Sequence, residues 1–81
     1  MPYIDQDKRD VVNPDLIGEL NFMITMLCDN YIMSHGKTYG VLNAVIGALE
    51  CSKLELYRRV AAPYEDKKMS ENGDVFSSVS L

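Results

Sequence analysis

The chain has 81 residues, and its 12 acidic side chains outnumber its 8 lysines and arginines, which gives a formal net charge of −4. This length permits one domain and excludes a large enclosed active site, because so short a chain buries only about 60–65% of its unfolded surface. The acidic balance argues against a general binder of polymeric nucleic acid or of membranes, since such proteins normally carry an excess of Lys and Arg.

The predicted elements are all helical, because helix signals recur along the chain and no hairpin signal is flanked by alternating β-branched residues. Asp5 is suited to cap a short first helix that ends near Val12. Asn13 is then expected to cap a second helix, from about residue 14 to residue 33, with a proline at its first position. Gly36 follows this helix and suits a left-handed position that ends it.

The second predicted helix is apolar nearly all the way round, whereas a surface helix needs only one apolar face. The rest of the chain is too short to cover it, so we expect another subunit to cover part of this helix or of the next. The sequence therefore predicts a homo-oligomer. The apolar side chains are Leu20, Met23, Ile24, Leu27 and Tyr31 on one face and Phe22, Met26 and Met33 on another.

A third helix is predicted to begin near Tyr39, with Thr38 as its cap. Two apolar stripes follow its helical spacing, which indicates neighbours on more than one side. We expect Ile46 and Leu49 to lie in the core. The stripes contain Leu42, Ile46, Leu49, Leu56 and Val60, and then Val45, Leu54, Tyr57 and Ala61.

Pro63 lacks the N–H group that the regular helical bond pattern uses, so the helix is expected to kink or restart there. A short charged helix then covers residues 64–71, and Gly73 follows its end. The predicted fold is an all-α small bundle with two long helices, a short N-terminal helix and a proline-kinked C-terminal helix. We expect one helical domain over residues 1–76 and a flexible tail over residues 77–81.

The start of the chain lacks the basic and apolar segments of a signal peptide, and no run of about 18 apolar residues occurs. We therefore expect a soluble intracellular protein. Cys28 and Cys51 fall within predicted helices, and without a secretion signal both are expected to be reduced and buried. One histidine and no Cys-x-x-Cys spacing argue against a zinc site, so we expect no metal and no cofactor.

Catalysis finds little support in the sequence. His35, the only histidine, is expected to cap the carbonyl groups at the end of the second helix. Carboxylates that hold a metal in a helical bundle usually recur at one-turn spacing. Glu50 and Glu55 are five residues apart and lie on different faces, which disfavours a metal-dependent nucleotide hydrolase. We expect no catalytic residue.

Basic residues are concentrated where the third helix approaches Pro63, whereas acidic side chains outnumber basic ones among the first 30 residues. Arginine supplies bidentate donors for phosphate, and tyrosine supplies a flat face for a base together with a hydroxyl. This combination favours binding of a small anionic nucleotide. The candidate ligand-binding residues are Lys53, Tyr57, Arg58, Arg59 and Tyr64, with Asn21 as a group that reads a polar edge.

The same residues also fit an ordinary helix surface. Glu55 precedes Arg58 and Arg59 by three and four residues, which is the spacing of ion pairs along one helix. Tyr57 also fits a core position with its hydroxyl at the rim. Because adjacent residues on a helix point about 100° apart, Glu55 is expected to pair with one arginine and leave the other to face a groove beside Pro63, where Tyr64 can approach.

Three polar residues interrupt otherwise apolar stretches: Asn21, Asn43 and Glu50. A buried polar group costs free energy unless it is paired. These side chains are therefore expected either to bond across helices or to line a polar pocket.

Several stretches resemble a family of small helical proteins of tailed phages, and together they cover most of residues 1–76. The most distinctive is Tyr-Arg-Arg-Val-x-x-Pro-Tyr-Glu-Asp at residues 57–66. This family is in turn similar to phage sponges that sequester cyclic dinucleotides from the bacterial CBASS defence. The resemblance implies a non-catalytic helical oligomer in the host cytoplasm, with pockets between subunits, and it carries over no individual ligand residue.

Three functions are compatible with these observations. The favoured one is a phage immune-evasion protein that binds and sequesters a cyclic dinucleotide without cleaving it. The second is a protein-interaction module that inhibits a host enzyme through an exposed apolar helix face. The third is a small all-α nucleotide pyrophosphohydrolase, which the carboxylate spacing disfavours.

Overall fold

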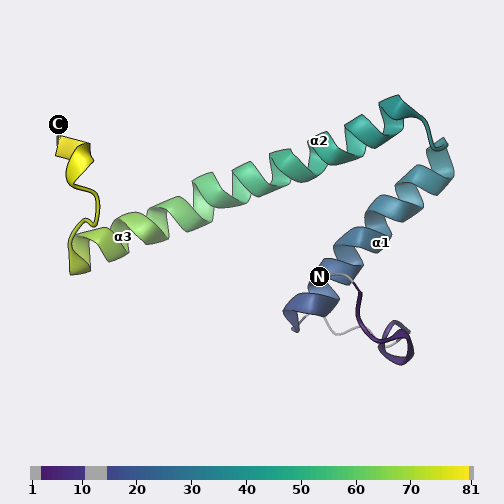
Figure 1. Ribbon diagram of the computed structural model, residues 1–81, viewed down its shortest axis with the longest axis horizontal. Helices are drawn as coiled ribbons and strands as arrows, with labels where there is room; N and C mark the ends of the chain where they lie inside the picture. The colour runs from purple at the N-terminus through teal and green to yellow at the C-terminus, as the bar shows by residue number, and fades with distance from the viewer. Residues whose placement is uncertain (1–2, 11–14, 81) are drawn as a thin grey trace. The chain divides into compact units, whose positions relative to one another are not determined.

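The computed structural model describes residues 3–10 and 15–80. Within them the chain is mostly helical and forms no strand, which confirms the predicted all-α class. The chain divides into two units, Met1–Ile46 and Gly47–Leu81, which are considered in turn. Figure 1 shows the order of the helices along the chain. Three residues named in the sequence predictions lie outside the described ranges: Val12, Asn13 and Pro14.

The first unit begins with a single 3-10 turn, η1 (Gln6–Lys8), where the sequence predicts a short helix capped by Asp5. The Asp5 side chain makes no capping hydrogen bond, and it is the Asp5 carbonyl oxygen that accepts the Lys8 N–H, at 3.0 Å. Arg9 Nε donates to the carbonyl oxygen of Ile4 at 3.1 Å. The described turn stays short because one turn of helix provides few hydrogen bonds to offset the cost of nucleation.

Helix α1 spans Ile17–His35, so it begins and ends slightly later than predicted. Leu16 precedes it in an extended conformation, and its carbonyl oxygen accepts the Leu20 N–H at 2.9 Å. At the other end Gly36 has φ 96° and ψ 146°, and its N–H donates to the carbonyl oxygen of Ile32 at 2.8 Å. The positive φ agrees with the prediction for this glycine. The ψ angle lies outside the left-handed helical region, so the chain leaves α1 in an extended direction.

Helix α2 spans Tyr39–Leu56, and Thr38 caps it as predicted. The Val41 N–H donates to Thr38 Oγ1 at 3.2 Å, and the Thr38 carbonyl oxygen accepts the Leu42 N–H at 3.0 Å. Threonine is a preferred cap because its hydroxyl satisfies an N–H group that has no partner within the first turn. The boundary between the two units falls within α2.

The second unit continues from α2 into a π-helix, η2 (Tyr57–Ala61), and then into α3 (Ala62–Asn72), without a break in the helical ribbon (Figure 1). The Ala62 N–H donates to the carbonyl oxygen of Tyr57, five residues earlier. A proline ring crowds the carbonyl group four residues before it, and a wider preceding turn accommodates that ring. The disturbance predicted at Pro63 is thus present as a π-turn, and the helix continues through it.

Helix α3 ends at Asn72, close to the predicted end, and Gly73 follows with φ 88°. The Gly73 N–H donates to the carbonyl oxygen of Met69 at 2.8 Å. A last 3-10 turn, η3 (Ser77–Ser80), falls within the segment that the sequence predicts to be a tail. This segment therefore has local helical structure, and its flexibility stays a prediction.

No apolar side chain is buried among the described residues, so the prediction of a core that includes Ile46 and Leu49 is wrong for the single chain. Ile46 is 64% exposed and Leu49 is 41% exposed, because neither unit has a second helix packed along α2. The apolar residues of α1 are also uncovered, with Leu27 at 71%. The one buried residue among those described carries a carboxylate, that of Glu19.

Candidate functional site

The candidate residues lie in both units. Asn21 lies on α1 in the first unit. The others lie on one uninterrupted helical stretch of the second unit, which crosses from α2 through η2 into α3. We call these five residues the cation–tyrosine cluster: Lys53, Tyr57, Arg58, Arg59 and Tyr64.

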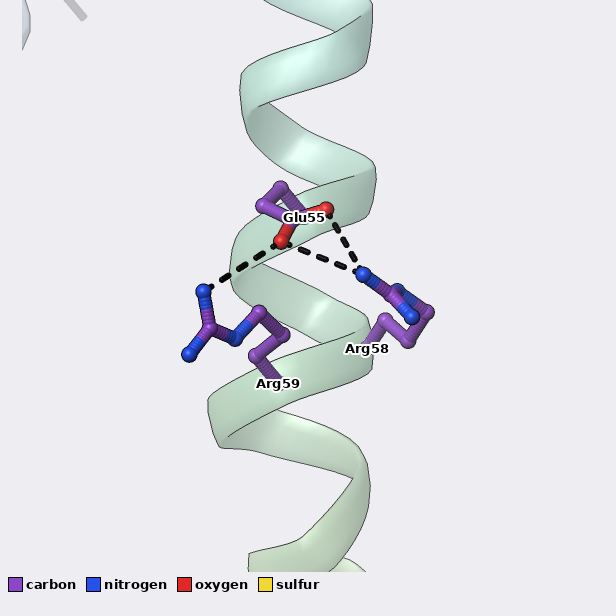
Figure 2. A network of polar contacts seen from close by, with 3 residues as sticks. All are labelled: Glu55, Arg58 and Arg59. Atoms are coloured by element: carbon purple, nitrogen blue, oxygen red, sulfur yellow. Dashed lines mark hydrogen bonds and ion pairs between the residues drawn. The ribbon is translucent and has the colours of Figure 1, made fainter.

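Glu55 contacts both arginines of the cluster (Figure 2). Arg58 Nη2 lies 3.2 Å from Glu55 Oε1 and 3.1 Å from Oε2, whereas Arg59 Nη1 lies 3.6 Å from Oε1. The prediction that Glu55 pairs with only one arginine is therefore wrong. A carboxylate offers two oxygens, and residues three and four positions further along a helix both come within reach of it. The two contacts are nevertheless unequal, since Arg58 is held more closely.

Lys53 is also paired on its own helix, with its Nζ 3.5 Å from Glu50 Oε1. The side chains of Lys53, Arg58 and Arg59 are 70%, 74% and 71% exposed, so all three ion pairs lie in solvent. Exposed pairs contribute only about 0–1 kcal/mol each, so exchange of a carboxylate for another anion costs little. Three cations face two carboxylates here, which leaves one positive charge in excess.

The two tyrosines of the cluster are exposed, Tyr57 at 52% and Tyr64 at 60%. Tyr57 is therefore not a core residue in the single chain. Its hydroxyl donates to Glu65 Oε2 at 3.4 Å, and Lys68 Nζ lies 5.5 Å from the centroid of the Tyr64 ring. Much of each aromatic ring stays open to solvent, which is what stacking on a base requires.

A shallow, open groove of about 690 Å³ lies beside Glu55 and Arg59. Arg59 lines it and Arg58 does not. The groove differs from the predicted one, because neither Pro63 nor Tyr64 lines it and Arg59 also contacts Glu55. The groove combines apolar and charged side chains from α2 and η2. Its lining residues are Cys51, Ser52, Glu55, Leu56, Arg59 and Val60.

Polar residues of the first unit make local contacts. The Thr25 hydroxyl donates to the carbonyl oxygen of Asn21 at 2.9 Å, one turn along α1. His35 Nδ1 lies 2.9 Å from the carbonyl oxygen of Tyr31, and the two rings stack with centroids 3.9 Å apart. The expected capping role of His35 is therefore confirmed. Asn21, Asn43 and Glu50 are all exposed in the single chain, so none of them needs a buried partner there.

The two cysteines are free thiols that differ in exposure. Cys28 is half-buried, whereas Cys51 is exposed and lines the groove, so the prediction that both are buried is wrong for Cys51. Across residues 3–10 and 15–80, no group of three or more His, Cys, Asp or Glu residues is placed to hold a metal ion. In the same part of the chain, no helix is both long and apolar enough to cross a membrane.

Compared with known families, the sequence matches over residues 1–75 the family described as a domain of unknown function (DUF6899). The chain belongs to this family. The DUF6899 match reaches into both units and includes the whole cation–tyrosine cluster. No curated protein and no solved structure matches the chain.

Sequence reasoning missed Glu19, which is only 5% exposed and whose Oε2 has no hydrogen-bond partner among the described residues. Glu19 lies in the first turn of α1, where a carboxylate is favoured by the helix dipole. The available signal was its position, as an acidic residue in the first turn of a mostly apolar helix. It borders a small surface pocket whose other lining residues are Tyr3, Ile4, Asp5, Lys8, Leu16 and Gly18.

Proposed function

We propose that this protein is a phage immune-evasion protein that binds and sequesters a cyclic dinucleotide in the host cytoplasm without cleaving it. The cation–tyrosine cluster is the observation that supports this proposal most directly. It presents three exposed cations and two exposed tyrosines on one helical stretch. The resemblance to phage proteins related to cyclic-dinucleotide sponges points to the same ligand class.

In this proposal the phosphates replace the carboxylates that now hold the cations. A phosphate group offers several acceptor oxygens, so one phosphate accepts from both Arg58 and Arg59 once Glu55 is displaced. Lys53 adds a further positive charge close by. A base stacks on Tyr57 or Tyr64, as aromatic side chains do for nucleobases in general.

Asn21 has a separate role in the proposal. Its side-chain amide both donates and accepts hydrogen bonds, which suits it to read the polar edge of a base. Asn21→Ala tests this role through titration with cyclic dinucleotides that carry different bases.

The protein is further proposed to act as a homo-oligomer. The support is that large apolar side chains are exposed along α1 and α2, including Met33 at 78% and Ile46 at 64%. Exposed apolar surface of this extent marks an interaction site in soluble proteins. A twofold arrangement of subunits also suits a ligand with two similar halves.

Calorimetric titration with cyclic dinucleotides tests the proposed site. Arg58→Ala and Arg59→Ala should each weaken binding by roughly 10- to 150-fold, because a charge-assisted hydrogen bond contributes about 1.5–3 kcal/mol. Lys37→Ala is the matched control, since it removes an exposed cation outside the cluster and should leave affinity unchanged. Equal binding by the two arginine variants and the parent protein would move the site elsewhere.

A thermal-shift panel of cyclic and linear nucleotides, with and without Mg²⁺, tests the class of function. Stabilisation by an intact cyclic ligand agrees with sequestration. Mg²⁺-dependent turnover would contradict the proposal and favour a nucleotide pyrophosphohydrolase instead.

A second candidate function is a protein-interaction module that inhibits a host enzyme. The observation that favours it is the uncovered apolar surface of α1, with Leu27 at 71% and Met33 at 78% exposed. If no nucleotide stabilises the protein, and Leu27→Asp leaves its own oligomeric state unchanged, a different protein becomes the expected occupant of this surface.

A further inference from the structure

The groove beside Glu55 and Arg59 carries charges that complement a second copy of themselves. We propose that it is a contact surface at which two copies of this chain pair in antiparallel orientation, about a twofold axis near Tyr57. This inference goes beyond the proposed function, because it identifies which surface joins two subunits of the protein without nucleotide. A phosphate that binds Arg59 competes with this contact.

The groove needs a cover for physical reasons. Its apolar residues Leu56 and Val60 are 62% and 60% exposed, and no described side chain of the second unit is buried. Isolated helices in water are marginally stable, and most helical stability in proteins comes from packing of an apolar face. A partner that covers this apolar face therefore adds to the stability of the helical stretch.

The charges indicate what the partner is. Glu55 and Arg59 lie four residues apart and line the same groove. In a twofold interface, residue i of one copy contacts residue j of the other, and j contacts i in return. An antiparallel pair centred near Tyr57 therefore sets Glu55 opposite the partner's Arg59, and Arg59 opposite the partner's Glu55. A second copy matches this pattern by symmetry, so no other sequence is needed to explain it.

Arg59 is the arginine that is available for such a contact. Glu55 already has two close contacts to Arg58, at 3.1 and 3.2 Å, whereas its contact to Arg59 is longer at 3.6 Å. Arg58 also lies outside the lining of the groove. Each Glu55 therefore keeps Arg58 as its partner within the chain while Arg59 turns towards the other copy.

The apolar residues fit the same arrangement. Leu56 and Val60 each follow one member of the charged pair in the sequence and line the same groove. Antiparallel pairing about Tyr57 places Leu56 next to the axis, close to Leu56 of the partner subunit, with Val60 about one turn further out on each chain. The interface then has an apolar centre with charged pairs beside it, as protein interfaces commonly do.

Charge reversal tests this arrangement by light scattering. Glu55→Arg and Arg59→Glu each create like charges across the proposed interface, so each variant alone should show half the assembled mass of the parent protein. Mixing the two variants in equal amounts sets a chain with arginine at both positions against a chain with glutamate at both positions. The mass should then return to the parent value. Repulsion within each chain persists in the mixture, so recovery reports contacts between chains.

Glu50→Arg is the matched control, because it reverses a charge on α2 that does not line the groove and sets it beside Lys53. Its assembled mass should equal that of the parent protein, and circular dichroism should show that all variants stay helical. A monomeric parent protein, full mass in either single variant, or no recovery in the mixture would overturn the proposal. All of these outcomes are measured without nucleotide. The pairing can therefore be wrong while the proposed function holds, and the proposed function can be wrong while the pairing holds.

Discussion

The first unit is dominated by an apolar helix, whereas the second carries charges at almost every turn. Helix α1 contains one acidic residue in its first turn and is otherwise nearly apolar up to Asp29. In the second unit, ion pairs join Lys53 to Glu50 and Lys68 to Glu71 on neighbouring turns. Contacts within one helix thus pair these charges. The apolar surface of the first unit has no comparable partner within the described chain, and only another molecule or another part of this protein can supply one.

Among the changes considered, removing apolar volume from α1 should have the largest effect on stability. Leu27→Ala should lower the free energy of unfolding by about 2–5 kcal/mol at a concentration where the protein is assembled, because the covered side chain leaves a cavity. If Leu27 stays as exposed in solution as it is in the single chain, at 71%, the loss should be within about 0.5 kcal/mol. Urea denaturation at micromolar concentration distinguishes the two values, with Lys37→Ala as the control.

The two cysteines report on the exposure of the two units, since one lies in each unit. Cys51 is exposed in the single chain but lines the groove of the second unit, so pairing with a second copy should protect it. Alkylation of Cys51 should be at least about tenfold slower in the parent protein than in Arg59→Glu, because that variant exposes the thiol while its added negative charge does not favour the thiolate. Half-buried Cys28 in the first unit serves as the internal reference. Equal rates at Cys51 in both proteins would mean that the groove is open in solution.

The sequence predicts contacts within a single helix better than it predicts which apolar faces are covered. The Thr38 cap, the role of His35 and the disturbance before Pro63 were predictable, because each depends on residues within five positions of one another. The ion pairs of Glu55 were predictable in kind but not in number. The exposure of Ile46 and Leu49 in the single chain was not predictable, since the apolar pattern of α2 does not identify which molecule covers it. A helical pattern shows which face must be covered and leaves open which molecule covers it.

The smallest expected effect lies at the start of α2. Thr38→Ala removes the hydroxyl that accepts the Val41 N–H at 3.2 Å, and should cost about 1 kcal/mol of stability. Thr38→Ser keeps that hydroxyl and should lose at most a few tenths of this amount. Thermal unfolding of the two variants side by side checks the difference, and equal melting temperatures would show that the cap contributes nothing to stability.

The central claim is that other copies of this chain cover the apolar surfaces that a single copy leaves exposed. Light scattering of the unmodified protein at micromolar concentration tests this claim most directly. The account predicts a mass of at least two chains, each of 9.1 kDa. A single species at 9.1 kDa would contradict it.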